Sequence, residues 1–163
     1  DNAGNEAEQK VRSVTVSDTT IPIIELIGDS EIRHEQGTLY TDAGATATDN
    51  IDGDITSSII SVSDVNADIA GSYTVTYSVV DNAGNEAEQK VRSVTVSDTT
   101  IPVISLVGQS EVSLELGTTY TDAGATATDN IDGDITDSIE IVSTVDINTV
   151  GTYSVTYLSL IHI

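Results

Sequence analysis

The sequence predicts an all-β protein built from tandem antiparallel β-sandwich domains. The first observation is a repeat: residues 1–22 recur letter for letter as residues 81–102, and residues 40–56 recur as 120–136, both at an offset of 80. The second is the abundance of Thr, Val, Ile, Ser and Tyr in short runs that turn residues interrupt about every 8–12 residues, as in sandwiches and barrels. The third is the lack of sustained helical periodicity. A unit of about 80 residues is too long for a solenoid and fits a self-contained small domain.

The composition excludes several classes of function. The chain has 163 residues and a net charge of −22, from 5 Lys and Arg against 27 Asp and Glu. Nucleic acid is therefore not expected as a partner, because phosphate binding needs a basic surface, and the same reason excludes anionic membrane surfaces. The sequence has no apolar run long enough for membrane insertion. The acidity instead favours solubility and the binding of cations.

Short strands are expected throughout the first repeat. Alternation and the intervening turn residues place the first four at residues 23–27, 31–35, 45–48 and 55–62. Residues 72–80 form the clearest strand, because one face is apolar and the other is polar. The apolar face consists of Tyr73, Val75, Tyr77 and Val79.

The end of the repeat reads as a hairpin. Residues 81–85, Asp-Asn-Ala-Gly-Asn, are typical of a turn, and the last strand is expected at residues 87–96. In that strand Val94 and Val96 share a face, whereas Val91 has the opposite parity. A β-bulge near residues 92–93 would restore the parity, and we predict one there.

The tyrosines allow two interpretations. Gly71 followed by Tyr73 resembles the start of a tyrosine corner, in which the hydroxyl donates back to nearby backbone. Alternatively, Tyr73 and Tyr77 are simply the large core residues of a domain that has no Trp or Phe.

Several motifs of the repeat together resemble a known family. They are Asp-Thr-Thr-Ile-Pro at residues 18–22 and the segments 40–50, 52–56, 71–77, 81–85 and 91–96. Nearly the whole chain resembles the bacterial Ig-like tandem-repeat family that includes the pesticidal-crystal-protein Ig-like domain, and it is more distantly similar to HYR modules. The resemblance implies tandem Ig-like antiparallel β-sandwich domains in an elongated array. It also implies a spacer or adhesive role in a secreted or surface-anchored bacterial protein, with no catalytic residue.

The resemblance places the start of each unit at Asp18 and Asp98. Residues 1–17 would then be the C-terminal hairpin of a preceding Ig-like repeat, residues 18–97 a complete repeat, and residues 98–163 a repeat truncated before its last strand. After Tyr157 the sequence departs from the repeat, and we interpret residues 158–163 as a non-native tail. Any signal or anchor would lie outside this fragment.

Acidic residues recur at three places in each unit and are the candidate metal ligands. In an Ig-like sandwich the start of the first strand and the loops at residues 49–54 and 81–85 would lie at one pole, where the preceding domain joins. Carboxylates packed together repel each other unless a hard cation such as calcium binds them. We therefore expect a calcium site from Asp18, Asp49, Asp52, Asp54 and Asp81, and a second from Asp98, Asp129, Asp132 and Asp134. The alternative is a set of solvated turns, in which Asp and Asn are also common.

The expected function is a structural spacer or stalk, adhesin-like, in an extracellular or cell-surface bacterial protein, with calcium at the inter-domain junctions. The alternative is a carbohydrate- or protein-binding accessory module of a secreted enzyme or toxin. Binding sites usually present aromatic or Arg anchors, which are scarce here, so a glycan or host-surface ligand would bind other domains. No enzyme is expected: catalytic motifs are missing, and His34 is replaced by Leu114 in the sister repeat.

The expected partners are adjacent Ig-like repeats of the same chain. Residues 1–17 are identical to residues 81–97, the hairpin that the second repeat lacks. An open sheet edge accepts a donor strand. The sequence therefore also predicts head-to-tail strand complementation between molecules by residues 1–17.

Overall fold

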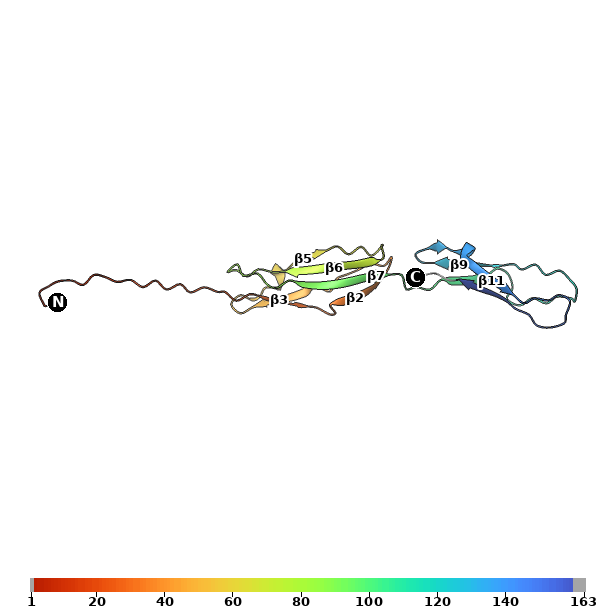
Figure 1. Ribbon diagram of the computed structural model, residues 1–163, viewed down its shortest axis with the longest axis horizontal. Helices are drawn as coiled ribbons and strands as arrows, with labels where there is room; N and C mark the ends of the chain where they lie inside the picture. The colour runs from red at the N-terminus through yellow and green to blue at the C-terminus, as the bar shows by residue number, and fades with distance from the viewer. Residues whose placement is uncertain (1, 160–163) are drawn as a thin grey trace. The chain divides into compact units, whose positions relative to one another are not determined.

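The protein is nearly all β, as its periodicity predicts. The computed structural model describes residues 2–159 (Figure 1). The strands of the first repeat are β1 (Ile23–Leu26), β2 (Glu31–Glu35), β3 (Ala45–Asp49), β4 (Gly53–Asp54), β5 (Ile60–Ser63), β6 (Gly71–Ser78) and β7 (Lys90–Ser97). Those of the second repeat are β8 (Val103–Leu106), β9 (Ala125–Asp129), β10 (Gly133–Asp134), β11 (Ile139–Ser143) and β12 (Val155–Ser159). One 3₁₀ turn follows β4 (η1, Thr56–Ser58) and another follows β10 (η2, Thr136–Ser138).

The contacts within the chain define two compact units. One consists of the residues up to Ser30 with Asp42–Asp64 and Thr74–Ser93, and the other of Glu31–Thr41, Val65–Tyr73 and the residues from Val94 onward. These units do not follow the sequence repeats. The domain boundaries expected at residues 18 and 98 therefore stay predictions.

The strands form antiparallel sheets. In the first repeat the sheets have the orders β1-β3-β4 and β2-β7-β6-β5, with Ile24 opposite Ala47 in the first of them. In the second repeat the orders are β10-β9-β8 and β11-β12. The buried apolar side chains come from β1, β3, β6, β7 and β9 and the residue after β6: Ile24, Ala45, Ala47, Val75, Tyr77, Val79, Val94, Val96 and Ala127.

The strand expected at residues 55–62 is divided in the structure. Thr56–Ser58 form η1, and only Ile60–Ser63 form a strand. Side-chain hydrogen bonds explain the turn: Asp54 Oδ1 accepts from the Thr56 N–H at 2.9 Å, and Thr56 Oγ1 accepts from the Ala47 N–H at 3.0 Å. The expected loop at 49–54 also contains β4, which pairs with β3.

The prediction of a β-bulge near residues 92–93 is wrong. β7 is continuous, and its burial alternates: Arg92, Val94 and Val96 are buried, whereas Val91 is 46% exposed. Arg92 therefore points inward, whereas the interpretation of the sequence had placed Val91 inward. No extra residue is needed to restore the parity.

Arg92 is 1% exposed and is held by a complete set of acceptors. Its guanidinium donates to the Asp42 carboxylate, to Tyr77 Oη at 3.1 Å and to the Gly44 carbonyl at 3.2 Å. It also donates to the carbonyls of Asp29 and Ile27, at 3.0 and 2.5 Å. Tyr77 donates its hydroxyl to the same carboxylate. A buried charge is tolerated when it is paired and hydrogen-bonded in this way.

Of the two tyrosines, one is a core residue and the other forms a tyrosine corner. Tyr77 is a core residue, 1% exposed. Tyr73 is half-buried and forms the corner: its hydroxyl donates to the Ile69 carbonyl at 2.9 Å. Gly71 lies against that ring, because a Cβ at this position would be 3.4 Å from it. Tyr153 repeats the bond to the Thr149 carbonyl, also at 2.9 Å.

Removal of the corner hydroxyl tests its contribution. We expect Tyr73→Phe to lower the free energy of unfolding of the first repeat by about 1 kcal/mol, the usual value of one intramolecular hydrogen bond. The equivalent Tyr153→Phe change should act on the second repeat alone. Urea unfolding followed by far-UV circular dichroism measures both, and wild-type midpoints in both variants would show that the bonds add nothing to stability.

Candidate metal centre

Three of the predicted ligands converge in the first repeat. Oxygen atoms of Asp18, Asp49 and Asp81 all lie within 4.8 Å of one another. Asp18 precedes β1, Asp49 is the last residue of β3, and Asp81 begins the turn after β6. Residues separated by up to 63 positions in the chain are thus placed together by the two sheets.

Asp49 carries the least satisfied oxygen of the group. Its Oδ1 accepts from the N–H groups of Ile51 and Asp52, at 2.8 and 3.0 Å. Its Oδ2 is buried and has no hydrogen-bond partner among the described residues. The backbone bonds from Asp52 and Ile51 lower the pKa of the Asp49 carboxyl, against the opposing effects of burial and the Asp81 charge. An ionised buried oxygen without a donor is unfavourable unless a cation compensates it.

Asp81 is held rigidly beside it. It is 7% exposed, and its carboxylate accepts from the Asn85 N–H and from Asn85 Nδ2, both at 2.7 Å. Burial by itself would raise the pKa of Asp81, but the hydrogen bonds from Asn85, Gly84 and Ala83 together lower it. Both buried carboxylates of the group are therefore kept in the charged form that a metal ion requires.

Asp52 and Asp54 are not part of this group. The two oxygens of Asp52 accept from the Asn82 N–H and from Asn82 Nδ2, at 2.8 and 2.7 Å. Asp52 thus joins the loop at 49–54 to the turn at 81–85 and helps to place Asp49 near Asp81. Asp54 accepts a hydrogen bond from the Thr56 N–H. The hydrogen bonds from the backbone and the side chain of Thr56 lower the pKa of the Asp54 carboxyl.

The second repeat reproduces part of the arrangement. Asp129 Oδ1 accepts from Ile131 and Asp132 at 2.8 and 3.1 Å, and Asp129 Oδ2 is again buried without a partner among the described residues. Burial and the charge of Asp129 raise the pKa of Asp98. Asp134 caps Thr136 at 3.0 Å, as Asp54 caps Thr56.

A third carboxylate is missing from this second set. Within residues 2–159, the Asp18 group is the only set of three acidic, His or Cys side chains with such spacing. Position 161, which corresponds to Asp81, is an isoleucine and lies outside the described residues. The nine predicted ligands therefore separate into one convergent triad, two carboxylates of an incomplete copy, and four residues outside any such group. These four are Asp52, Asp54, Asp132 and Asp134.

The donor set of the triad suits a hard divalent cation. Calcium takes 6–8 oxygen ligands from carboxylates, amides and backbone carbonyls at about 2.3–2.6 Å. Asn85 Nδ2 also contacts the Asp18 carbonyl at 3.4 Å, so the backbone at the start of the repeat is tied to the same turn. The arrangement therefore offers the charge and the oxygen ligands that such a cation requires.

Sequence comparisons agree with the fold. Residues 24–96 and 104–159 each match the family model of the bacterial surface protein Ig-like domain. Pesticidal crystal protein Cry22Aa of Bacillus thuringiensis is 37% identical over 72% of the chain, and hyalin of Strongylocentrotus purpuratus is 31% identical over 73%. The chain spans only 16% and 10% of the length of these two relatives.

Solved structures give weaker similarities. A lipoprotein of Bacteroides thetaiotaomicron matches with a TM-score of 0.44 and 28% identity, over 50% of this chain and 40% of that one. The structure of a CBM51 module in complex with GlcNAc and INT domains of Clostridium perfringens ZmpB matches with a TM-score of 0.39 and 24% identity, over 85% and 26%. None of the described helices is long and apolar enough to cross a membrane. Because the two segments that match the family model cover most of the sequence, the chain belongs to the bacterial surface protein Ig-like domain family.

Proposed function

We propose that this chain is a non-catalytic spacer of a secreted or cell-surface bacterial protein, adhesin-like, in which calcium stiffens the junction at the start of the first repeat. The observation that carries the proposal is the buried, unpartnered Oδ2 of Asp49, which lies in a triad of carboxylates and recurs at Asp129. A bound cation would relieve the repulsion between these neighbouring carboxylates without disturbing the turns that hold them.

The position of the triad gives the cation a mechanical role. Asp18 directly follows residues 2–17, which contain no strand, whereas Asp49 and Asp81 belong to the folded repeat. A calcium ion bound to all three would fix the point at which the preceding segment enters the domain. Without the ion, mutual repulsion of the carboxylates would loosen that point.

The exposed surface favours a spacer over a binding module. All six tyrosines are buried or half-buried, and the chain has no Trp or Phe. Arg92 is buried among its acceptors. The tyrosines and Arg92 are thus engaged in structure, which leaves few of the aromatic and Arg side chains that dominate binding hot spots.

Amide hydrogen exchange tests the stiffening directly. In millimolar calcium, exchange at residues 18–20, 49–54 and 81–85 should slow at least severalfold relative to excess chelator, because the ion links these three segments. Asp49→Asn should abolish the difference, whereas Asp29→Asn, which removes an exposed carboxylate of the same repeat, should preserve it. Equal exchange rates with calcium and with chelator would contradict the proposal.

A further inference from the structure

Tension along the chain would enter the first repeat through β1. Asp18 precedes this strand, and residues 23–26 are already extended, so a pull on their start cannot lengthen them. They pair with residues 45–48 of β3 along one antiparallel ladder, which gives way only if β1 slides as a whole. The load therefore passes to the segment that follows β1, residues 27–30.

The segment that follows β1 is fastened to β7, mainly by one buried side chain. Arg92 of β7 donates from Nε to the Asp29 carbonyl at 3.0 Å and from Nη2 to the Ile27 carbonyl at 2.5 Å. The Ser93 N–H adds a bond to the Ser30 carbonyl at 2.8 Å. Two neighbouring residues of β7 thus hold three carbonyls of this short segment.

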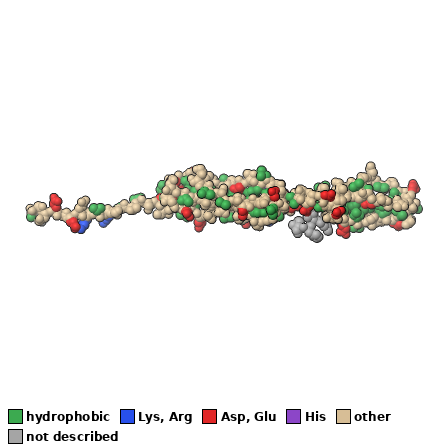
Figure 2. Space-filling view, turned by 90° about the horizontal axis from the view of Figure 1, so that it is seen from above, with side chains coloured by type: hydrophobic (Ala, Val, Ile, Leu, Met, Phe, Trp, Pro, Cys, Tyr) green, Lys and Arg blue, Asp and Glu red, His purple; other side chains and the backbone are tan. Residues whose placement is uncertain are grey.

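The same guanidinium also holds the segment that precedes β3. Its Nη2 donates to the Gly44 carbonyl at 3.2 Å, and its Nη1 donates to Asp42 and to Tyr77 Oη. Arg92 is 1% exposed, so water does not compete for these bonds while they are stretched. The basic side chains visible in Figure 2 lie instead on the N-terminal segment.

β7 would carry the load out of the repeat. It is a continuous extended strand from Lys90 to Ser97, so tension reaches its end without lengthening it. A path from Asp18 to Ser97 thus crosses from the end of β1 to β7 at Arg92, and it leaves out residues 31–89. While this link holds, the strands and turns in between bear little of the tension.

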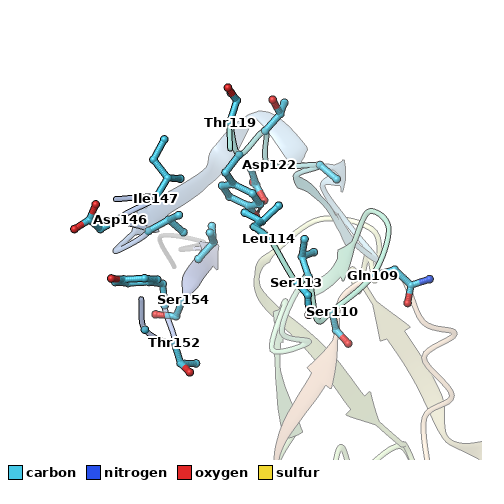
Figure 3. Close-up of a pocket in the computed structure, with 18 of the residues that line it drawn as sticks. Gln109, Ser110, Ser113, Leu114, Thr119, Asp122, Asp146, Ile147, Thr152 and Ser154 are labelled. Atoms are coloured by element: carbon cyan, nitrogen blue, oxygen red, sulfur yellow. Dashed lines mark hydrogen bonds between the residues drawn. The ribbon is translucent and has the colours of Figure 1, made fainter. Parts of the chain in front are cut away.

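The second repeat reproduces the acceptors of the link. Tyr157 donates its hydroxyl to Asp122 at 2.5 Å, as the equivalent pair does in the first repeat. The Val107 N–H bonds the Gly124 carbonyl at 2.9 Å, again as in the first repeat. Figure 3 shows Asp122 among the residues that line a hollow of the second repeat. The arrangement of the acceptors is therefore a property of the repeated sequence.

We propose that Arg92 is the tension-bearing link of the first repeat and lets the repeat transmit a pulling force without unfolding. Force that enters at Asp18 crosses from residues 27–30 to β7 through the guanidinium and leaves at Ser97. Rupture of the link releases residues 31–89 together, roughly 200 Å of extended chain. The inference rests on the proposed spacer function only for its biological use, because a spacer carries tension between other domains. The link itself requires no calcium.

Single-molecule force spectroscopy of the full chain in chelator tests the link. The chain has no cysteine, so Ser17→Cys and Ile101→Cys place unique handles on exposed residues that flank the first repeat. We expect the wild type to unfold in a single step of at least about 200 Å. Arg92→Met should raise the rate of unfolding at a fixed force by at least about tenfold. Arg33→Met, at an exposed position of β2, should leave that rate unchanged.

Asp42→Asn separates a load-bearing role from a merely stabilising one. This change removes the carboxylate partner of the buried guanidinium and so destabilises the repeat, yet it leaves the bonds to the Ile27 and Asp29 carbonyls in place. Rates of unfolding in urea, without force, give the structural effect of each variant. Arg92→Met should speed unfolding by a larger factor under force than in urea, whereas Asp42→Asn should not.

Arg92→Lys provides the test if the methionine variant does not fold. It keeps the charge but lacks the planar fork that reaches both carbonyls, so it should show the same excess acceleration under force to a smaller extent. Equal factors with and without force for these Arg92 variants would overturn the proposal, as would a wild type that lengthens in several small steps. Neither outcome bears on the spacer function, which calcium-dependent hydrogen exchange tests separately.

Discussion

Arg92→Met lowers the free energy of unfolding of the first repeat by about 3–5 kcal/mol, the range observed when one partner of a buried ion pair is removed. The methionine fills much of the same space, so the loss is mainly electrostatic. Asp42 is left with a charge whose guanidinium partner is gone, and five groups lose the guanidinium as a donor: Asp42, Tyr77, Asp29, Ile27 and Gly44. Asp42 keeps the Tyr77 hydroxyl, and the Gly44 carbonyl keeps the Ile27 N–H. Each such buried acceptor is expensive to leave unsatisfied.

Thermal unfolding with hydrogen exchange at β6 and β7 measures this loss. For a domain of this size each kcal/mol shifts the midpoint by about 4–8 °C, so a decrease well above 10 °C is expected. Arg12→Met is the matched control, since the same residue in the same local sequence is exposed there and should leave the first repeat unchanged. Combining Arg92→Met with Asp42→Asn should recover part of the loss, because the stranded charge is removed. A shift of only a few degrees in the single variant would contradict a structural role for the ion pair.

If the triad binds calcium as proposed, we expect the ion to raise the stability of the first repeat by about 2.7 kcal/mol when its free concentration is a hundred times the dissociation constant. This corresponds to an increase of about 10–20 °C in the unfolding midpoint for a domain of this size. The second repeat should gain less, because its described residues supply Asp98 and Asp129 without a third carboxylate.

Differential scanning calorimetry with calcium and with excess chelator measures the effect. A high, constant ionic strength keeps the general screening of the carboxylates equal in the two conditions. Asp49→Asn and Asp81→Asn should each remove the calcium-dependent shift, measured against each variant's own midpoint in chelator. In chelator both variants should be less stable than the wild type, because the hydrogen bonds that lower these two pKa values favour the ionised carboxylate. Asp29→Asn should retain the shift. An equal response of all the proteins to calcium would mean that the ion acts through net charge and not through the triad.

The acidic triad shows how far sequence reasoning reaches at a site. The argument from sandwich topology correctly expected the three acidic segments to meet at one pole. It could not tell that Asp49 belongs to the group and Asp52 does not, because both are aspartates in the same loop of six residues. The structure separates them by their partners: Asn82 occupies both oxygens of Asp52, whereas Oδ2 of Asp49 is left with none among the described residues.

Arg92 shows the reverse case, in which a general rule misled the interpretation. Charged side chains are seldom buried, so the sequence analysis placed Val91 inward and required a bulge. The signal was nevertheless present, since Arg92 has the same parity as Val94 and Val96. Only the acceptors on other segments, Asp42 and the carbonyls of Ile27, Asp29 and Gly44, explain why a guanidinium is stable in that position.

The sequence by itself determined the β class, the repeat, the family and most strand positions, including the bounds of β2, because alternation and turn chemistry are local properties. Which segments become strands was decided by tertiary structure. Residues 9–17 and 89–97 have the same sequence, yet only the second contains a strand in the structure. The physical reason is that the backbone N–H and C=O groups of a β-strand bond to neighbouring strands. A segment with the right side-chain pattern therefore forms a strand only where a neighbouring strand can pair with it.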